Sequence, residues 1–229
     1  MNVCLICQQD SVDSITWTNL FLPPENSALC PACQEKLERI QGPICKKCGR
    51  KLPESAVCSD CQKWEHNKQF HDTLQYNRAL FRYTPFMQEI ITQWKYRGDY
   101  QLIELFTPYL KQPLFPKQKL TIIPIPLSEQ RLYERAFNQS LQLAEKVASH
   151  WKLPIVEALA RHPVHIEKQS KKSRQQRLST ENPFFLSQSL QTEVLLVDDI
   201  YTTGMTIHHA ASLLKQAGCQ AIYSFTLVR

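Results

Sequence analysis

Eight cysteines near the start of the chain constrain its fold more than any other feature. They fall within the first 61 residues as four Cys-x-x-Cys pairs: Cys4/Cys7, Cys30/Cys33, Cys45/Cys48 and Cys58/Cys61. A Cys-x-x-Cys turn presents two thiolates to one tetrahedral metal, and two such turns complete a four-cysteine zinc site. A single pair is also typical of a redox dithiol, whereas four pairs in succession indicate two Zn²⁺ ions. The sequence therefore predicts a zinc-binding module in residues 1–66.

The four pairs can be combined into two zinc sites in more than one way. We predict sequential pairing, with Cys4, Cys7, Cys30 and Cys33 on one ion and Cys45, Cys48, Cys58 and Cys61 on the other. A cross-braced arrangement is the alternative. Because so short a fragment buries little core, we expect both ions to be structural rather than redox-active or DNA-reading. A DNA-reading finger would add a basic helix, and none accompanies these cysteines.

The sequence carries no sign of secretion or of membrane insertion. No run of about 20 apolar residues occurs, and the start at Met1 lacks the basic and apolar regions of a signal peptide. Cysteines without such a signal favour metal binding over disulfides. We therefore expect a cytoplasmic location and no membrane insertion. The ninth cysteine, Cys219, lies in the apolar segment Cys219–Val228 and is expected to be a core residue of a buried strand.

Charge is unevenly distributed along the chain. Residues 1–66 hold 7 Lys/Arg and 8 Asp/Glu, whereas residues 67–229 hold 20 and 13. Eight thiolates, only partly balanced by two Zn²⁺ ions, would make the N-terminal module more acidic still. An anionic partner is therefore predicted to bind residues 67–229 rather than the zinc module.

Strands and helices alternate through residues 67–229. Apolar runs predict strands at Leu74–Tyr83, Leu120–Ile125, Val194–Val197 and Ala221–Val228, with a short apolar segment at Leu153–Leu159. Helical periodicity and end signals predict helices at Pro85–Tyr96, Tyr100–Leu110, Asn138–His150 and Thr203–Ala217. This alternation predicts an α/β domain with a parallel, doubly wound sheet.

The segment from Val194 to Thr206 is the most specific motif. An apolar strand ends in two carboxylates, Asp198 and Asp199, and a Thr-Thr-Gly-x-Thr turn then leads into a helix. Turn N–H groups, threonine hydroxyls and a helix N-terminus suit a phosphate, and Gly204 allows its close approach. The carboxylates can accept hydrogen bonds from a ribose diol. An acidic pair that caps a helix or binds Mg²⁺ in another nucleotide fold is the alternative.

This motif resembles the phosphoribosyl-pyrophosphate (PRPP) signature of type I phosphoribosyltransferases. The resemblance implies that the two aspartates bind the ribose hydroxyls, and that the 5-phosphate is bound by Thr202, Thr203, Gly204 and Thr206.

Two further segments resemble the ComF (ComFC) competence-protein family. Residues 123–139 are similar to its Pro-x-Pro…Arg-x-x-x-Arg-Gly-Phe-Asn-Gln stretch, with Ala136 where glycine is usual, and residues 94–99 are similar to its Leu-Lys-Tyr-x-Gly-Asp stretch. The likeness puts Arg131 and Arg135 in the loop that would hold pyrophosphate, a task that suits paired guanidinium donors. Residues 161–182 match the family pattern only loosely.

The resemblance spans essentially the whole chain and implies a domain organisation and a role. The family joins a double zinc ribbon, here residues 1–66, to a phosphoribosyltransferase-like domain, here residues 67–229. It implies a late competence protein of natural transformation that acts in uptake and cytoplasmic handling of single-stranded DNA. The implied partners are single-stranded DNA, a helicase-like competence protein, and PRPP or a related ribose phosphate, which Mg²⁺ could accompany.

Residues 161–177 form the densest basic stretch, with six Lys/Arg and one Glu. Hydrophobic periodicity is lost there, which predicts a loop, and its candidate DNA contacts are Lys168, Lys171, Lys172, Arg174 and Arg177. A lid that closes over pyrophosphate and a plain solvated loop are the alternatives.

Two classes of function stay open for the transferase-like domain. It could transfer phosphoribose to an unidentified acceptor, or it could serve as a binding module within the DNA-uptake machinery. The sequence contains no recognisable base-binding hood, which favours the binding module, because an intact pocket does not by itself prove turnover.

Overall fold

Four parallel strands form the central sheet of the computed structural model, which describes residues 2–11, 28–115, 119–163 and 182–229. Their order across the sheet is β3 (Asn77–Phe81), β8 (Ile222–Val228), β7 (Glu193–Ile200) and β4 (Leu120–Pro124). All residues of β4, at one edge of the sheet, and all but one of the central strand β8 are buried, because both faces of a parallel sheet are covered. The predicted α/β class with a parallel sheet is confirmed.

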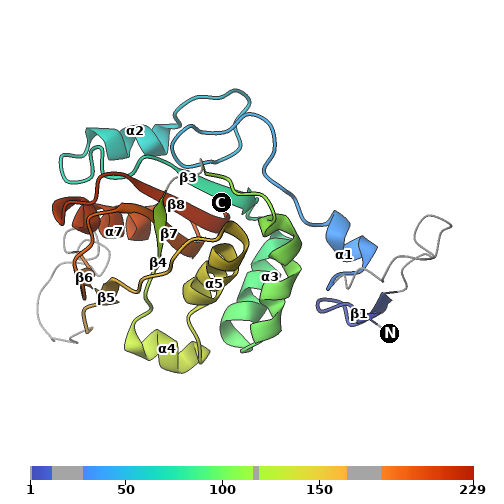
Figure 1. Cartoon of the computed structure of the whole chain (residues 1–229). Coiled ribbons are helices and arrows are strands. Elements are labelled where there is room, and N and C mark those ends of the chain that lie inside the picture. The colour runs from blue at the N-terminus through green and yellow to red at the C-terminus, as the bar shows by residue number, and fades with distance from the viewer. Residues whose placement is uncertain (1, 12–27, 116–118, 164–181) are drawn as a thin grey trace, which may run out of the picture.

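Helices cover both faces of this sheet. They are α3 (Pro85–Tyr96), α5 (Gln139–Trp151) and α7 (Met205–Gln216). Leu195 and Val197 of β7 share a buried cluster with α3 and α5, whereas Val194 and Leu196 share another with α7. Because successive side chains of a strand point to opposite faces, one apolar run supports both layers. Figure 1 shows α3 and α5 side by side, with α7 on the other side of the strands.

Helices α3 and α5 each begin where a capping side chain satisfies one of the first N–H groups. Thr84 accepts a hydrogen bond from the Met87 amide at 3.2 Å, and Pro85 occupies the first turn of α3. Asn138 accepts from the Ser140 amide at 3.0 Å at the start of α5. Among the described helices, none combines the length and the apolar character needed to cross a bilayer.

The helix predicted at Tyr100–Leu110 is wrong in type. The segment forms two 3₁₀ helices, η1 (Tyr100–Leu105) and η2 (Thr107–Leu110). Pro108 lacks an N–H group and disfavours helical backbone angles in the residue before it, so a continuous α-helix cannot form. The apolar residues of this segment, Leu102, Leu105 and Leu110, are nevertheless buried.

One further prediction needs correction. Strand β8 begins at Ile222, so Cys219 lies in the turn after α7 rather than in a strand, although it is buried and its thiol donates to the Leu190 carbonyl at 3.2 Å. The apolar segment Leu153–Leu159 pairs with β4 at Ile155, where the Val156 N–H donates to the Ile122 carbonyl at 2.9 Å. The chain then forms a short antiparallel pair, β5 (Leu159–Arg161) and β6 (Phe184–Leu186).

The two cysteine-rich parts relate differently to the sheet. Figure 1 shows β1 (Asn2–Val3) and α1 (Pro31–Glu35) standing apart from it, whereas α2 (Ser59–His66) lies beside it. The small strand β2 (Asp10–Ser11) pairs with β1. Asn77, fully buried at the start of β3, joins the sheet to the second cysteine-rich part, which contains Cys45 to Cys61. Its backbone N–H donates to the Lys47 carbonyl at 2.7 Å, and its side-chain amide donates to the Cys48 carbonyl at 3.1 Å.

Candidate functional site

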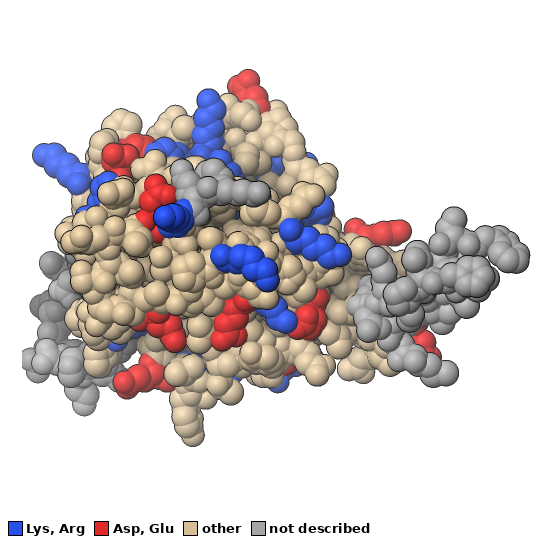
Figure 2. Space-filling view, in the orientation of Figure 1, with Lys and Arg blue, Asp and Glu red and all other residues tan. Residues whose placement is uncertain are grey.

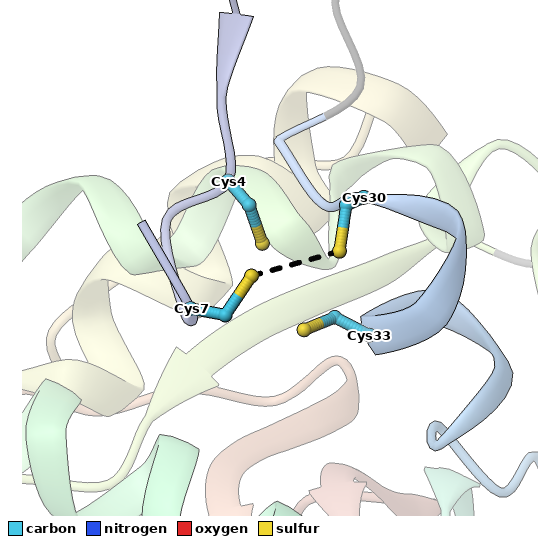
Figure 3. A group of neighbouring side chains, drawn as sticks. All are labelled: Cys4, Cys7, Cys30 and Cys33. Atoms are coloured by element: carbon cyan, nitrogen blue, oxygen red, sulfur yellow. Dashed lines mark hydrogen bonds between the residues drawn. The ribbon is translucent and has the colours of Figure 1, made fainter. Parts of the chain in front are cut away.

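The eight N-terminal cysteines form two groups of four. One group is Cys4, Cys7, Cys30 and Cys33, and the other is Cys45, Cys48, Cys58 and Cys61. Within each group all Sγ atoms lie within 4.8 Å of one another. In Figure 3 the four side chains of the first group converge on a common centre. The grouping is the sequential one, and the cross-braced alternative is wrong.

The separations between sulfur atoms fit zinc. They are 3.7 Å for Cys7–Cys30, 3.8 Å for Cys45–Cys61 and 3.8 Å for Cys48–Cys58. A tetrahedron with Zn–S bonds of about 2.3 Å has edges of about 3.8 Å, whereas a disulfide needs about 2.0 Å. The Cys58 amide also donates to the Cys45 sulfur at 3.4 Å, as thiolate ligands favour. Each group fits a closed, structural four-thiolate zinc site.

A cavity of about 230 Å³ lies at the carboxyl ends of β4 and β7. In an open α/β sheet this edge is where ligands bind. The cavity brings together predicted residues from segments far apart in the sequence: Arg131, Arg135, Asp198, Asp199, Thr202 and Thr206. Sequence reasoning missed four other polar residues of the lining, which are Lys95 from α3, Gln139 and Ser140 from α5, and Arg161 from β5. Thr203 lines a neighbouring cavity instead.

The two aspartates are held by different partners. The Ser140 hydroxyl donates to Asp198 Oδ1 at 2.8 Å, and the Lys95 ammonium forms an ion pair with Asp199. Desolvation, reinforced by the charge of Asp199, raises the pKa of Asp198 from its usual value to about 7. Near neutral pH, Asp198 can therefore either donate or accept a hydrogen bond, whereas the neighbouring carboxylate is compensated by a cation.

The arginines of the cavity are incompletely paired. Both Arg131 and Arg135 lie on a short helix, α4 (Glu129–Arg135), and not in the loop that the sequence predicted. Arg135 is 8 % exposed and donates to Gln139 Oε1 at 3.3 Å, but its Nε, like that of Arg161, is buried with no acceptor among the described residues. Burial, with the charge of Arg131, lowers the pKa of Arg161. An anion placed among these groups would supply the missing acceptors.

The loop after β7 has a backbone that only glycine allows. Gly204 has φ +88°, and a Cβ built there would lie 2.2 Å from the Tyr201 hydroxyl. Helix α7 starts immediately after it, so the first N–H groups of this helix have no acceptor within the helix. The Met205 N–H donates to the Thr203 hydroxyl at 3.4 Å, and the N–H groups that follow it, with the helix dipole, favour a bound anion at this position.

The missed residues carried weak or misplaced signals. Lys95 belongs to the segment at residues 94–99 that resembles the competence family, but nothing in that segment shows that it pairs with an aspartate about 100 positions later. Arg161 was counted as the first cation of the basic loop, whereas β5 fixes it in the cavity wall. The predicted DNA contacts, Lys168, Lys171, Lys172, Arg174 and Arg177, lie outside the described residues.

We predict two zinc ions in each chain of freshly purified, reduced protein, as measured by elemental analysis. Cys45→Ser should lower the content to one ion and destabilise the second cysteine group, because metal binding supplies much of its folding energy. Cys219→Ser is the matched control and should retain both ions, since this thiol contacts the Leu190 carbonyl. Wild-type protein without zinc would contradict the assignment.

The raised pKa of Asp198 predicts a pH dependence of stability. The unfolded residue releases its proton at about pH 4, the folded one at about pH 7, so this proton stabilises the fold at low pH and its contribution is lost as the pH rises to about 7. Asp198→Asn cannot ionise, so its free energy of unfolding relative to wild type should increase from about pH 4 to about pH 7.

Chemical denaturation at several pH values measures this difference. The difference, rather than either curve alone, is decisive, because burial lowers the pKa of His208 to about 4 and gives both proteins an opposite trend. A difference that stays constant across the range would show that Asp198 has an ordinary pKa.

Comparison with known proteins agrees with both parts of the structure. Residues 2–62 match the double zinc ribbon domain family, and residues 138–229 match the phosphoribosyl transferase domain family. The chain is 35% identical to competence protein ComFC of Bacillus subtilis, over 99% of this chain and 95% of that protein. It is 34% identical to competence protein ComFC of Streptococcus pneumoniae, over 99% of each. DNA utilization protein YhgH of Salmonella typhimurium is 24% identical, over 88% of this chain and 96% of its own length. Similarity to both ComFC proteins over nearly the whole chain, with both domain matches, shows that this protein belongs to the ComFC family.

Proposed function

We propose that the cavity at the end of β7 binds PRPP or a closely related ribose phosphate. The observation that carries this proposal is that one cavity contains both unpaired hydrogen-bond donors and carboxylate acceptors. Buried nitrogen atoms of Arg135 and Arg161 lack acceptors, while Asp198 and Asp199 offer acceptors at the same sheet edge. A ligand with phosphate oxygens beside ribose hydroxyls satisfies both sets of groups.

The proposal gives each part of the cavity a role. Arg131 and Arg135, joined by Arg161, bind the pyrophosphate, and Asp198 and Asp199 accept hydrogen bonds from the ribose hydroxyls. The 5-phosphate lies against the loop formed by Thr202, Thr203, Gly204 and Thr206. Mg²⁺ would enter with PRPP, neutralising part of the pyrophosphate charge.

We favour a binding module over an active transferase. The relatives are named for competence and for DNA utilization, and the sequence contains no recognisable hood for an acceptor base. An active phosphoribosyltransferase on an unidentified acceptor is the alternative. A pyrophosphate-release assay with PRPP and candidate acceptors distinguishes the two, because only a transferase releases pyrophosphate faster with an acceptor present.

Arg135→Lys should weaken PRPP binding about tenfold, measured by calorimetry on zinc-loaded protein, because lysine keeps the charge but loses the paired donors. Arg82→Lys is the control: Arg82 is exposed and pairs with Glu38, away from the cavity, so PRPP affinity should not change. A folded Arg135→Lys protein with wild-type affinity would contradict the pyrophosphate assignment.

We further propose that the protein acts late in competence, in the uptake and cytoplasmic handling of single-stranded DNA, together with a helicase-like partner. The names of the relatives and the charge distribution support this role. On the face drawn in Figure 2, Lys and Arg side chains are interspersed with Asp and Glu. Residues 161–177 are the densest basic stretch of the sequence and are therefore the candidate for the DNA contact.

Replacing Lys171, Lys172, Arg174 and Arg177 with glutamine should weaken binding to all single-stranded sequences alike. Cations that contact a flexible backbone do not read bases, and each neutralised phosphate adds about 0.7 to the slope of log K against log salt. The slope should therefore flatten in this variant, as measured by fluorescence anisotropy at several salt concentrations.

A control variant replaces four exposed lysines elsewhere, Lys36, Lys46, Lys51 and Lys111, and changes the net charge equally. It should keep a slope close to that of wild type. Equal flattening in both variants would mean that total charge, and not residues 161–177, governs DNA binding.

A further inference from the structure

Two side chains hydrogen-bond three consecutive backbone carbonyls of the loop after β7. One is Arg229, which follows β8, and the other is Trp64, on α2 beside the second cysteine group. Arg229 Nη1 donates to the carbonyl oxygen of Tyr201 at 3.0 Å and also to that of Thr202. The indole N–H of Trp64, on α2, donates to the carbonyl of Thr203 at 3.1 Å. Each carbonyl is thereby fixed in direction.

Fixing the carbonyls also fixes the N–H groups. The described chain has no cis peptide bond, so in each peptide unit the N–H points opposite to the C=O. The N–H groups of Thr202, Thr203 and Gly204 therefore point away from Arg229 and Trp64. None of the three donates to an acceptor among the described residues. Three free, successive N–H donors beside a helix N-terminus make a binding site for phosphate.

The same side chains join this loop to the second zinc site. Arg229 Nη2 donates to the sulfur of Cys48 at 3.4 Å, and when zinc is bound this sulfur is a thiolate, which strengthens the contact. Trp64 follows Cys61 on α2, and its ring stacks on His208 at a centroid distance of 4.2 Å. His208 Nε2 in turn lies 3.3 Å from the Tyr201 hydroxyl, which packs against Gly204.

We propose that Arg229 and Trp64 are positioning residues for the 5-phosphate of the ligand, and that the second zinc ribbon is thereby an integral part of the ribose-phosphate site. The inference rests on the proposed function, because it concerns the same cavity. Neither residue contacts the ligand; both orient the peptide groups that do. The first ribbon makes no described contact with this loop and has no such role.

Trp64→Phe tests the inference with the smallest change, because it removes the indole N–H and keeps an aromatic ring on His208. Calorimetry on full-length, zinc-loaded protein should show ribose 5-phosphate binding weakened about fivefold, while inorganic pyrophosphate, bound at the arginines, binds as in wild type. Trp151→Phe is the matched control, since its indole also donates to a backbone carbonyl, that of Leu110, at 2.7 Å. It should change neither affinity.

Arg229→Gln should weaken ribose 5-phosphate binding about tenfold or more, because two carbonyls lose a charged donor, and Arg229→Lys should recover part of this loss. Reciprocity of linked equilibria gives a second readout. Ribose 5-phosphate should slow the release of one zinc ion to a chromogenic chelator in wild type, and this protection should vanish in Arg229→Gln.

The outcomes separate the inference from the proposed function. If wild type binds neither ribose 5-phosphate nor pyrophosphate, the proposed function itself fails. If wild type binds both, but Trp64→Phe binds ribose 5-phosphate with unchanged affinity, the inference is overturned while the proposed function stands. The inference is also overturned if Trp64→Phe loses affinity for both ligands equally, because that result indicates general damage rather than a change in the phosphate loop.

Discussion

The ion pair between Lys95 and Asp199 connects helix α3 to the end of strand β7, and the balance of charge in the cavity depends on it. Ionising both of two adjacent carboxylates in a poorly hydrated position is unfavourable, because desolvation and mutual repulsion disfavour the second charge. Lys95 compensates one of them, and the other, Asp198, is left with a raised pKa. The arginines approach from α4 and β5, so part of their positive charge lacks a direct acceptor. Burial of these incompletely paired charged groups destabilises the free protein, and a ligand that carries both phosphate acceptors and hydroxyl donors can offset this destabilisation.

Two residues with left-handed backbone angles, Ala136 and Gly204, set the course of the chain after α4 and in the loop after β7. Ala136 ends α4 with φ +67°, in the left-handed region, where the family usually has glycine. An alanine in this conformation costs about 1 kcal/mol relative to glycine, yet the turn keeps the geometry that glycine would adopt. Gly204 cannot be exchanged in the same way, because the Tyr201 ring occupies the space of a Cβ. The first turn tolerates a side chain, whereas the second requires its absence.

Much of the fold was predictable from the sequence, and what was missed has physical reasons. Buried parallel strands are continuous apolar runs, so β4, β7 and β8 were found, and the Cys-x-x-Cys spacing gave the zinc ligands. Helix α4 was missed because its seven residues are too short to show a period, although Ser128 marks its start. The roles of Lys95, Arg161 and Arg229 depend on contacts with residues far away in the sequence. A local sequence pattern does not predict such contacts.

The strand order has a consequence for synthesis of the protein on the ribosome. Strand β8, residues 222–228, lies between β3 and β7, so the sheet stays divided into two parts until this segment has been made. The cysteine groups, complete by residue 61, can take up zinc much earlier. Until β8 arrives, β3 lacks its parallel partner and the apolar side chains of β7 lack part of their cover. A nascent chain of this kind is most exposed to aggregation just before its last strand is added.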